Sequence, residues 1–377
     1  MKLLDKHRFK SVIFPLFIAV ITTLLYFLPS SFDKPENPYA ARVKARVLAV
    51  NNDDILEVGI IKSGYQALQI IVEQGTFKGD TLQASNQLMG RMEFDKIFEP
   101  NQEALVVLNL DESLQKIISV NVIDHYRLGI EFWLMLLFFA FLLLFAGTVG
   151  LKAIISFAFT GMVIWKLLLP GFLMGYSPVF LSLTLVAVIT TVIILLVAGI
   201  NKRGLVALLG AISGILVTAV LSQIFGVLFQ IHGAIKPFSE TLLYSGFNHL
   251  DLTQIFLASI FISSSGAMMD IAMDIAVSQY EIVEIQPTIT HKALIRSGFN
   301  IGRGVIGTMT TTLLLAYSGG FSALLMVFIA QGTPTINILN LNYVAGEILH
   351  TMIGSFGLVL VAPITAILGG MIFVKRH

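Results

Sequence analysis

The chain has 377 residues, of which 56% are hydrophobic and 12% are charged, and its mean hydropathy is +0.84. A soluble domain carries roughly 25% charged residues, so this composition excludes a soluble protein and is typical of an integral membrane protein. The net charge of +1 argues against a nucleic-acid partner, and the absence of cysteine excludes disulfides, thiolate metal sites and cysteine nucleophiles.

The N-terminal segment predicts a first transmembrane helix. Lys2, Lys6, Arg8 and Lys10 precede an apolar run at 11–28, and no small-x-small cleavage site comes after it. We therefore expect an uncleaved helix within residues 1–29, with the N-terminus inside by the positive-inside rule.

Residues 30–127 have a different composition, in which charged residues alternate with short apolar runs. The runs of strand length and β-rich composition are 42–50, 56–62, 66–72, 104–110 and 117–123. They predict a small all-β domain, a barrel or sandwich of five or six strands, on the outer side of the membrane. Because it has no cluster of histidines and carboxylates, we expect it to make contacts or to act in gating, not to catalyse a reaction.

From residue 128 the chain is apolar again, and 128–377 predicts a multi-helix membrane domain. Runs of about 20 apolar residues are long enough to cross a bilayer. They lie at 128–149, 153–173, 178–198, 205–229, 255–277, 294–317 and 348–374. With 11–28 they make about eight transmembrane helices. Lys152, Lys202, Arg203 and Lys292 then fall on the inner side, as the positive-inside rule requires.

The segment 321–340 does not fit this series. Its ten apolar residues at 321–330 rise only about 15 Å as a helix, and Gly332 and Pro334 break the helical pattern after residue 330. If the segment crosses, there are nine spans and the Lys375–His377 tail faces outward, against the charge rule. We favour a re-entrant segment and eight spans. Non-helical backbone at membrane depth must be buried in protein or line a wet cavity, so Gln331 is a site candidate.

Charged residues inside two neighbouring apolar runs form the strongest functional signal. Asp270 and Asp274 come after Ser263 and Gly266 at helical spacing, and Arg296, Asn300 and Arg303 share a face of the next helix. A charge inside the bilayer costs about 2.5–3.5 kcal/mol on insertion scales. The residues therefore either pair with one another as a structural salt bridge or bind a substrate or coupling ion, and both interpretations stay open.

Small residues beside these charges predict close helix packing. The pairs are Gly298 with Gly302, and Gly210 with Gly214. Glu347 and His350 lie three residues apart at the start of the last run, where we expect a hydrogen-bonded helix start or a weaker metal-type spacing.

The motifs that would indicate an enzyme are missing. The sequence contains no HExxH, no G-x-S-x-G, no P-loop and no Gly-x-Gly-Asp motif. We therefore expect no enzyme, no cofactor and no resident metal.

Two stretches around these charges resemble the YibE/F family of bacterial multi-pass membrane proteins. They are 265–276, which contains both aspartates, and 296–317, which contains both arginines, and the segment 354–363 is similar too. The resemblance covers 124–377 and implies a bacterial cell membrane location. It also implies a paired subunit of the same family as a partner, and a homo-oligomer is the alternative. The family usually has Arg-Asp where this chain has Arg303-Gly304, so one carboxylate of the pattern is missing here.

These observations favour a secondary permease or exporter of an unknown small solute. Its polar site would consist of Asp270, Asp274, Arg296, Asn300 and Arg303. The alternative is a non-transporting scaffold or sensor in which the β-domain binds a partner and the charges only hold helices together.

Overall fold

The computed structural model describes residues 2–29, 32 and 37–374, with side chains from residue 12 onward. The chain forms two compact units, one of residues 33–144 and one of residues 1–32 with 145–377. The basic side chains before residue 12 and the tail at 375–377, on which part of the predicted topology depends, lie outside the described residues.

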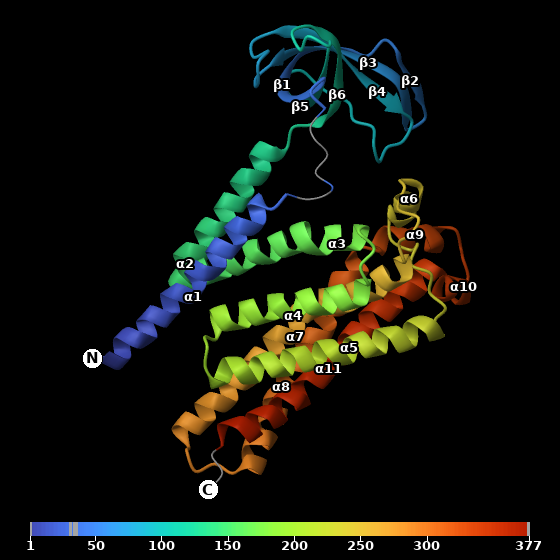
Figure 1. The fold of residues 1–377 in the computed structure, drawn as a ribbon. Coiled ribbons are helices and arrows are strands. Elements are labelled where there is room, and N and C mark those ends of the chain that lie inside the picture. Colours follow the sequence, from blue (N-terminus) through green and yellow to red (C-terminus); the bar gives the residue numbers. More distant parts are fainter. Residues whose placement is uncertain (1, 30–31, 33–36, 375–377) are drawn as a thin grey trace. The chain divides into compact units, whose positions relative to one another are not determined.

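The first unit contains a six-stranded, mostly antiparallel β-sheet that closes into a barrel (Figure 1). Its strands are β1 (Ala40–Asn51), β2 (Ile55–Val58), β3 (Ile61–Val72), β4 (Thr81–Met89), β5 (Glu103–Leu110) and β6 (Ile117–His125). The order β1-β5-β6-β4-β3-β2 closes through a second pairing of β1 with β3. One parallel bridge, Ser85 to Asn121, joins β4 to β6. This connectivity is that of a five-stranded Greek-key barrel of the OB type, extended by β2.

The predicted all-β domain is thus confirmed, and of the two predicted forms it is the barrel, but two details of the prediction were wrong. The run 56–62 is split between β2 and β3 by a turn in which Gly59 has a φ of +63°. Strand β4 was not predicted, because its inward positions include Asn86. This asparagine is buried and donates to the Gln66 side chain at 3.2 Å and to the Lys96 carbonyl at 2.6 Å. The Asn86 amide, whose hydrogen bonds are made, occupies an inward position at which the alternating strand pattern would require an apolar residue.

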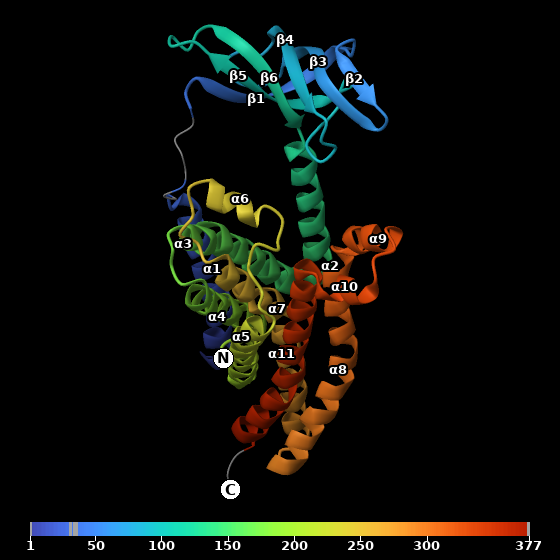
Figure 2. The same cartoon turned by 90° about the vertical axis from the view of Figure 1, so that its right-hand side faces the viewer.

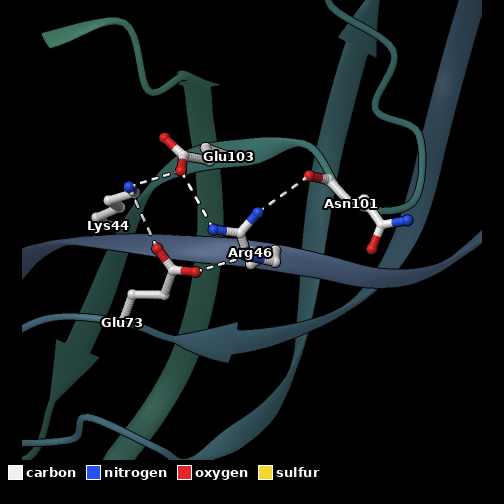
Figure 3. A network of polar contacts seen from close by, with 5 residues as sticks. All are labelled: Lys44, Arg46, Glu73, Asn101 and Glu103. Atoms are coloured by element: carbon white, nitrogen blue, oxygen red, sulfur yellow. Dashed lines mark hydrogen bonds and ion pairs between the residues drawn. The ribbon is translucent and has the colours of Figure 1, made fainter. Parts of the chain in front are cut away.

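A charged network ties β1 to its neighbours on the barrel surface (Figure 3). Lys44 contacts Glu103 at 2.7 Å and Glu73 at 3.3 Å, while Arg46 contacts the same two carboxylates. Burial opposes ionisation of Glu73, but the hydrogen bonds from Arg46 and Lys44 outweigh it and lower the pKa of this carboxyl. The hydrogen bond to Glu103 is the main reason that the pKa of Lys44 is raised. The network therefore stabilises the closure of the barrel in its charged form.

The long helices coincide with the predicted apolar runs but have shifted ends, whereas the short helices at 239–244 and 335–340 match no predicted run. The helices are α1 (Lys2–Phe27), α2 (Leu128–Val163), the π-helix Ile164–Leu168, α3 (Leu169–Leu173), α4 (Pro178–Val197), α5 (Lys202–Leu228), α6 (Ser239–Tyr244), α7 (Leu252–Ile285), α8 (His291–Gly319), α9 (Ser322–Ala330), α10 (Thr335–Asn340) and α11 (Asn342–Phe373). The last helix begins six residues before the predicted 348, so Glu347 and His350 lie within α11 and not at its start.

The helix count stays a prediction. By length and composition, five helices in the described residues could cross a membrane, or six if α8 and α9, bent by 64°, form one span. The predicted eight adds the shorter apolar stretch Val12–Phe27 and divides 128–173 into two spans. That division has a structural counterpart, because Gly147 has non-helical angles (φ 52°, ψ −122°) and interrupts α2 close to the predicted gap.

Glycines allow α5, α7, α8 and α11 to pack closely, and these helices lie side by side in both views (Figures 1 and 2). A Cβ on Gly210 would meet Thr365, and one on Gly214 would meet Val361. Gly298 and Gly302 likewise approach Ala366 and Ala362 of α11. The predicted role of these small-residue pairs is confirmed.

Candidate functional site

A polar cluster forms where α7, α8 and α11 converge. The Ser263 hydroxyl of α7 lies 2.7 Å from Nε2 of His350 on α11 and accepts a hydrogen bond of 3.0 Å from the Tyr317 hydroxyl of α8. The rings of Tyr317 and His350 stack with centroids 4.4 Å apart. Three helices therefore share one hydroxyl group, and the His350 at its inner side is only 6% exposed.

The hydrogen bonds of this cluster are incomplete. Ser263 has one proton, and its hydroxyl lies 2.8 Å from the Ser259 carbonyl as well as next to His350. Nδ1 of His350 is buried and has no hydrogen-bond partner in the described residues. Whichever tautomer the ring adopts, one ring nitrogen is left unsatisfied, which costs about 1–3 kcal/mol.

An ion pair lies next to this cluster along α11. Glu347 contacts Lys236 at 3.0 Å, and Nζ of Lys236 lies over the rings of Phe256 and Phe321, 5.8 Å and 5.0 Å from their centroids. This contact ties the loop before α6 to α11. Of the two predicted residues, His350 belongs to the polar cluster and Glu347 belongs to this ion pair.

The four predicted charges lie on exposed faces of α7 and α8. Asp270 and Asp274 are exposed on α7, and Arg296, Asn300 and Arg303 are exposed on α8. No ion pair within 4 Å joins either aspartate to either arginine in the described part of the chain. The described residues show no ion pair between these helices, and both interpretations of the charges, a structural salt bridge and a binding site, stay predictions.

Helical spacing nevertheless places both aspartates on the same face of α7 as Ser263, and Arg303 on the same face of α8 as Tyr317. On α7, Asp270 and Asp274 come seven and eleven residues after Ser263, and on α8, Arg303 and Thr310 precede Tyr317 by fourteen and seven. Both sets keep one helix face. Ser263 and Tyr317 touch at one end of these two faces. We call these six residues the polar seam: Ser263, Asp270 and Asp274 with Arg303, Thr310 and Tyr317.

A cavity of about 430 Å³ opens beside the seam, between α2, α4 and α7. Its wall is mostly aliphatic, with hydroxyl groups of Ser156, Thr160, Ser263 and Ser265 as the polar part. Ser263 thus belongs both to the cavity wall and to the polar cluster. Volume and lining are in the range of sites that hold a small, largely apolar molecule.

Gln331 does not join this site. It ends α9, its side chain is exposed, and Gly332 comes next with a φ of +66°.

Tyr317 was not identified from the sequence as a member of the polar cluster, nor was Lys236 identified as the partner of Glu347. The seven-residue spacing of Arg303, Thr310 and Tyr317 was the available signal for the first. In the described residues, no group of three or more histidines, cysteines or carboxylates could hold a metal ion.

The fold defines a helical protein with several apolar helices of membrane-spanning length and a small β-barrel. The family model described as YibE/F-like protein matches residues 134–375, so the chain belongs to the YibE/F family. The match includes every residue of the seam and leaves out the barrel. No curated protein and no solved structure gives a significant match.

Proposed function

We propose that this protein is a secondary permease for a small solute, and that the polar seam lines the solute path. The observation that carries the proposal is that two acids and one base lie on apolar helices without pairing with one another. Facing lipid, such charges cost about 2.5–3.5 kcal/mol each on insertion scales. Water or a polar solute between α7 and α8 removes that cost, whereas a purely structural seam would be expected to close into ion pairs.

The parts of the seam have separate roles in this proposal. The cavity beside Ser263 holds the apolar part of the solute, and Asp270 with Arg303 interacts with its polar groups or with a coupling ion. His350 contacts the site through the hydroxyl of Ser263, so we infer that the hydrogen bonding of its ring changes when the site is occupied.

The absence of cysteine makes this proposal testable without a known solute. The single variants Asp270→Cys and Arg303→Cys are reconstituted and treated with a membrane-impermeant methanethiosulfonate reagent. Such reagents react with the thiolate, which forms in water and not in hydrocarbon. Both variants are expected to react.

The matched control is Val220→Cys on α5, which is exposed and has apolar neighbours. It is expected to stay unmodified because it faces lipid. Unreactive cysteines at 270 and 303 in folded protein would contradict a wet path and favour the scaffold or sensor alternative.

A further inference from the structure

The β-barrel carries a second pocket that the permease proposal does not use. It has a volume of about 430 Å³ and lies where β4 and β6 diverge beyond their single bridge, Ser85 to Asn121. Tyr65, Gln87 and Asn121 line it together with apolar side chains of Met89 and Ile123. Polar and apolar groups are therefore mixed along one outward face of β3, β4 and β6.

The charged side chains that line this pocket, Asp95 and Lys96, already form hydrogen bonds or ion pairs with other residues of the barrel. Asp95 accepts hydrogen bonds from the backbone N–H of Met89 at 2.8 Å and of Arg91 at 2.6 Å, and the first of these is the main reason for its lowered pKa. Lys96 contacts Asp124 at 3.3 Å and donates to the Ile123 carbonyl at 3.0 Å. Among the described residues that line the pocket, no uncompensated charge remains to attract a nucleic acid or an acidic ligand.

The strand edges along the pocket are also occupied. The Met89 N–H is taken by Asp95 and the Ile123 carbonyl by Lys96, so a peptide that adds as a further strand finds these ladder groups already bonded. Recognition must then come from side chains. Tyr65 and Gln87 are cross-strand partners, and neither the Tyr65 hydroxyl nor the Gln87 amide has a hydrogen-bond partner in the described residues.

We propose that this pocket binds a neutral oligosaccharide. An exposed aromatic ring offers a flat apolar surface to the C–H face of a sugar, and free amides match its hydroxyl groups as donors and acceptors. Tyr65, which is 54% exposed, supplies the ring. Gln87 supplies a free amide, and Asn121 supplies its NH₂ group, because its Oδ1 already accepts a hydrogen bond of 3.3 Å from Ser85. OB-type barrels bind oligosaccharides on the face of their second and third strands, which here are β3 and β4.

The test uses the whole chain in lipid nanodiscs prepared without glycoside detergents, because a maltoside or glucoside would compete for the pocket. Isothermal titration with cellotetraose and with tetra-N-acetylchitotetraose is expected to show saturable binding of at least one. Tyr65→Ala and Gln87→Ala should each weaken it roughly tenfold. Tyr65→Phe should retain part of the affinity, because the ring remains and only the hydroxyl is lost.

Tyr39→Ala is the matched control, since Tyr39 is an exposed tyrosine of the same unit outside this pocket. It should bind as the native chain does. The proposal is overturned if neither probe binds, if the Tyr65 and Gln87 variants bind normally, or if Tyr39→Ala loses as much affinity as they do. Thiol accessibility of the seam is independent of each of these outcomes, so failure of one proposal is distinguishable from failure of the other.

Discussion

A single hydroxyl group can contribute measurably to stability when side chains of several helices bind to it, as they do to Ser263. Ser263→Ala would remove the partner of both Tyr317 and Nε2 of His350. Leaving buried polar groups unsatisfied costs about 1–3 kcal/mol, so we expect the free energy of unfolding in nanodiscs to fall by that amount. Ser265→Ala is the control, because Ser265 bonds only to the Ile262 carbonyl of its own helix. Equal stability of the two variants would show that the cluster does not hold the helices together.

The relation between Asp270 and Arg303 is a second question at the level of residues. Because no ion pair joins them, a double-mutant cycle with Asp270→Asn and Arg303→Gln is expected to give a coupling free energy of unfolding below about 0.5 kcal/mol. Both single variants should insert and fold. A coupling of several kcal/mol, or recovery of stability in the charge swap Asp270→Arg with Arg303→Asp, would instead identify a structural salt bridge.

Among the elements, the β1 network links barrel stability to pH. The pKa of Glu73 is lowered below its ordinary value of 4.5, so its stabilisation is complete above that pH and is lost as the pH falls through the lowered pKa. Glu73→Gln should cost about 1 kcal/mol at neutral pH, and this difference should shrink in acid. Hydrogen exchange of β1 and β5 amides in the whole chain measures it.

Glu57→Gln is the control for this measurement. Glu57 forms an exposed pair with Lys62, and such pairs contribute little to stability. A pH-independent effect of Glu73→Gln, or an equal effect of Glu57→Gln, would contradict the assigned role of the network.

Helix packing gives a prediction for α11. A Cβ on Gly357 would collide with Thr218 and Met268, whereas one on Gly304 of α8 has open space around it. Gly357→Ala is therefore expected to destabilise the protein by about 1–3 kcal/mol, and Gly304→Ala is expected to be neutral or slightly stabilising in thermal unfolding. The reverse order would mean that α5 and α11 are not in close contact.

The elements that could be predicted are those in which one signal dominates. Apolar length located the helices α4, α5, α7, α8 and α11, and alternation located β1, β5 and β6. Strand β4 could not be found because Asn86 points inward, and the start of α11 was misplaced because polar residues occupy its first turns. The shared helix faces of the polar seam could be predicted, because they follow from the helical period of about 3.6 residues per turn. The contact of Tyr317 with Ser263 depends on the angle and depth at which α8 crosses α7. A single sequence does not specify that crossing geometry.

For the molecule as a whole, the outward face of α8 predicts a partner. Arg296, Asn300, Gly307 and Thr311 extend the exposed stripe of α8 that also carries Arg303, and charged or amide groups are costly against lipid. We expect a second copy of the chain or a paired YibE/F-family subunit to cover it. A photo-crosslinker at position 311 in intact membranes should yield a protein adduct. Adducts with lipid only, as expected at position 220, would contradict this.

The claim that the polar seam is a solute path is tested most directly by access from both sides. A permease must open its site to each side of the membrane in turn. In sealed vesicles of both orientations, the thiol of Asp270→Cys should therefore react with an impermeant reagent added to either face. Modification from one face only, or from neither, would contradict the account.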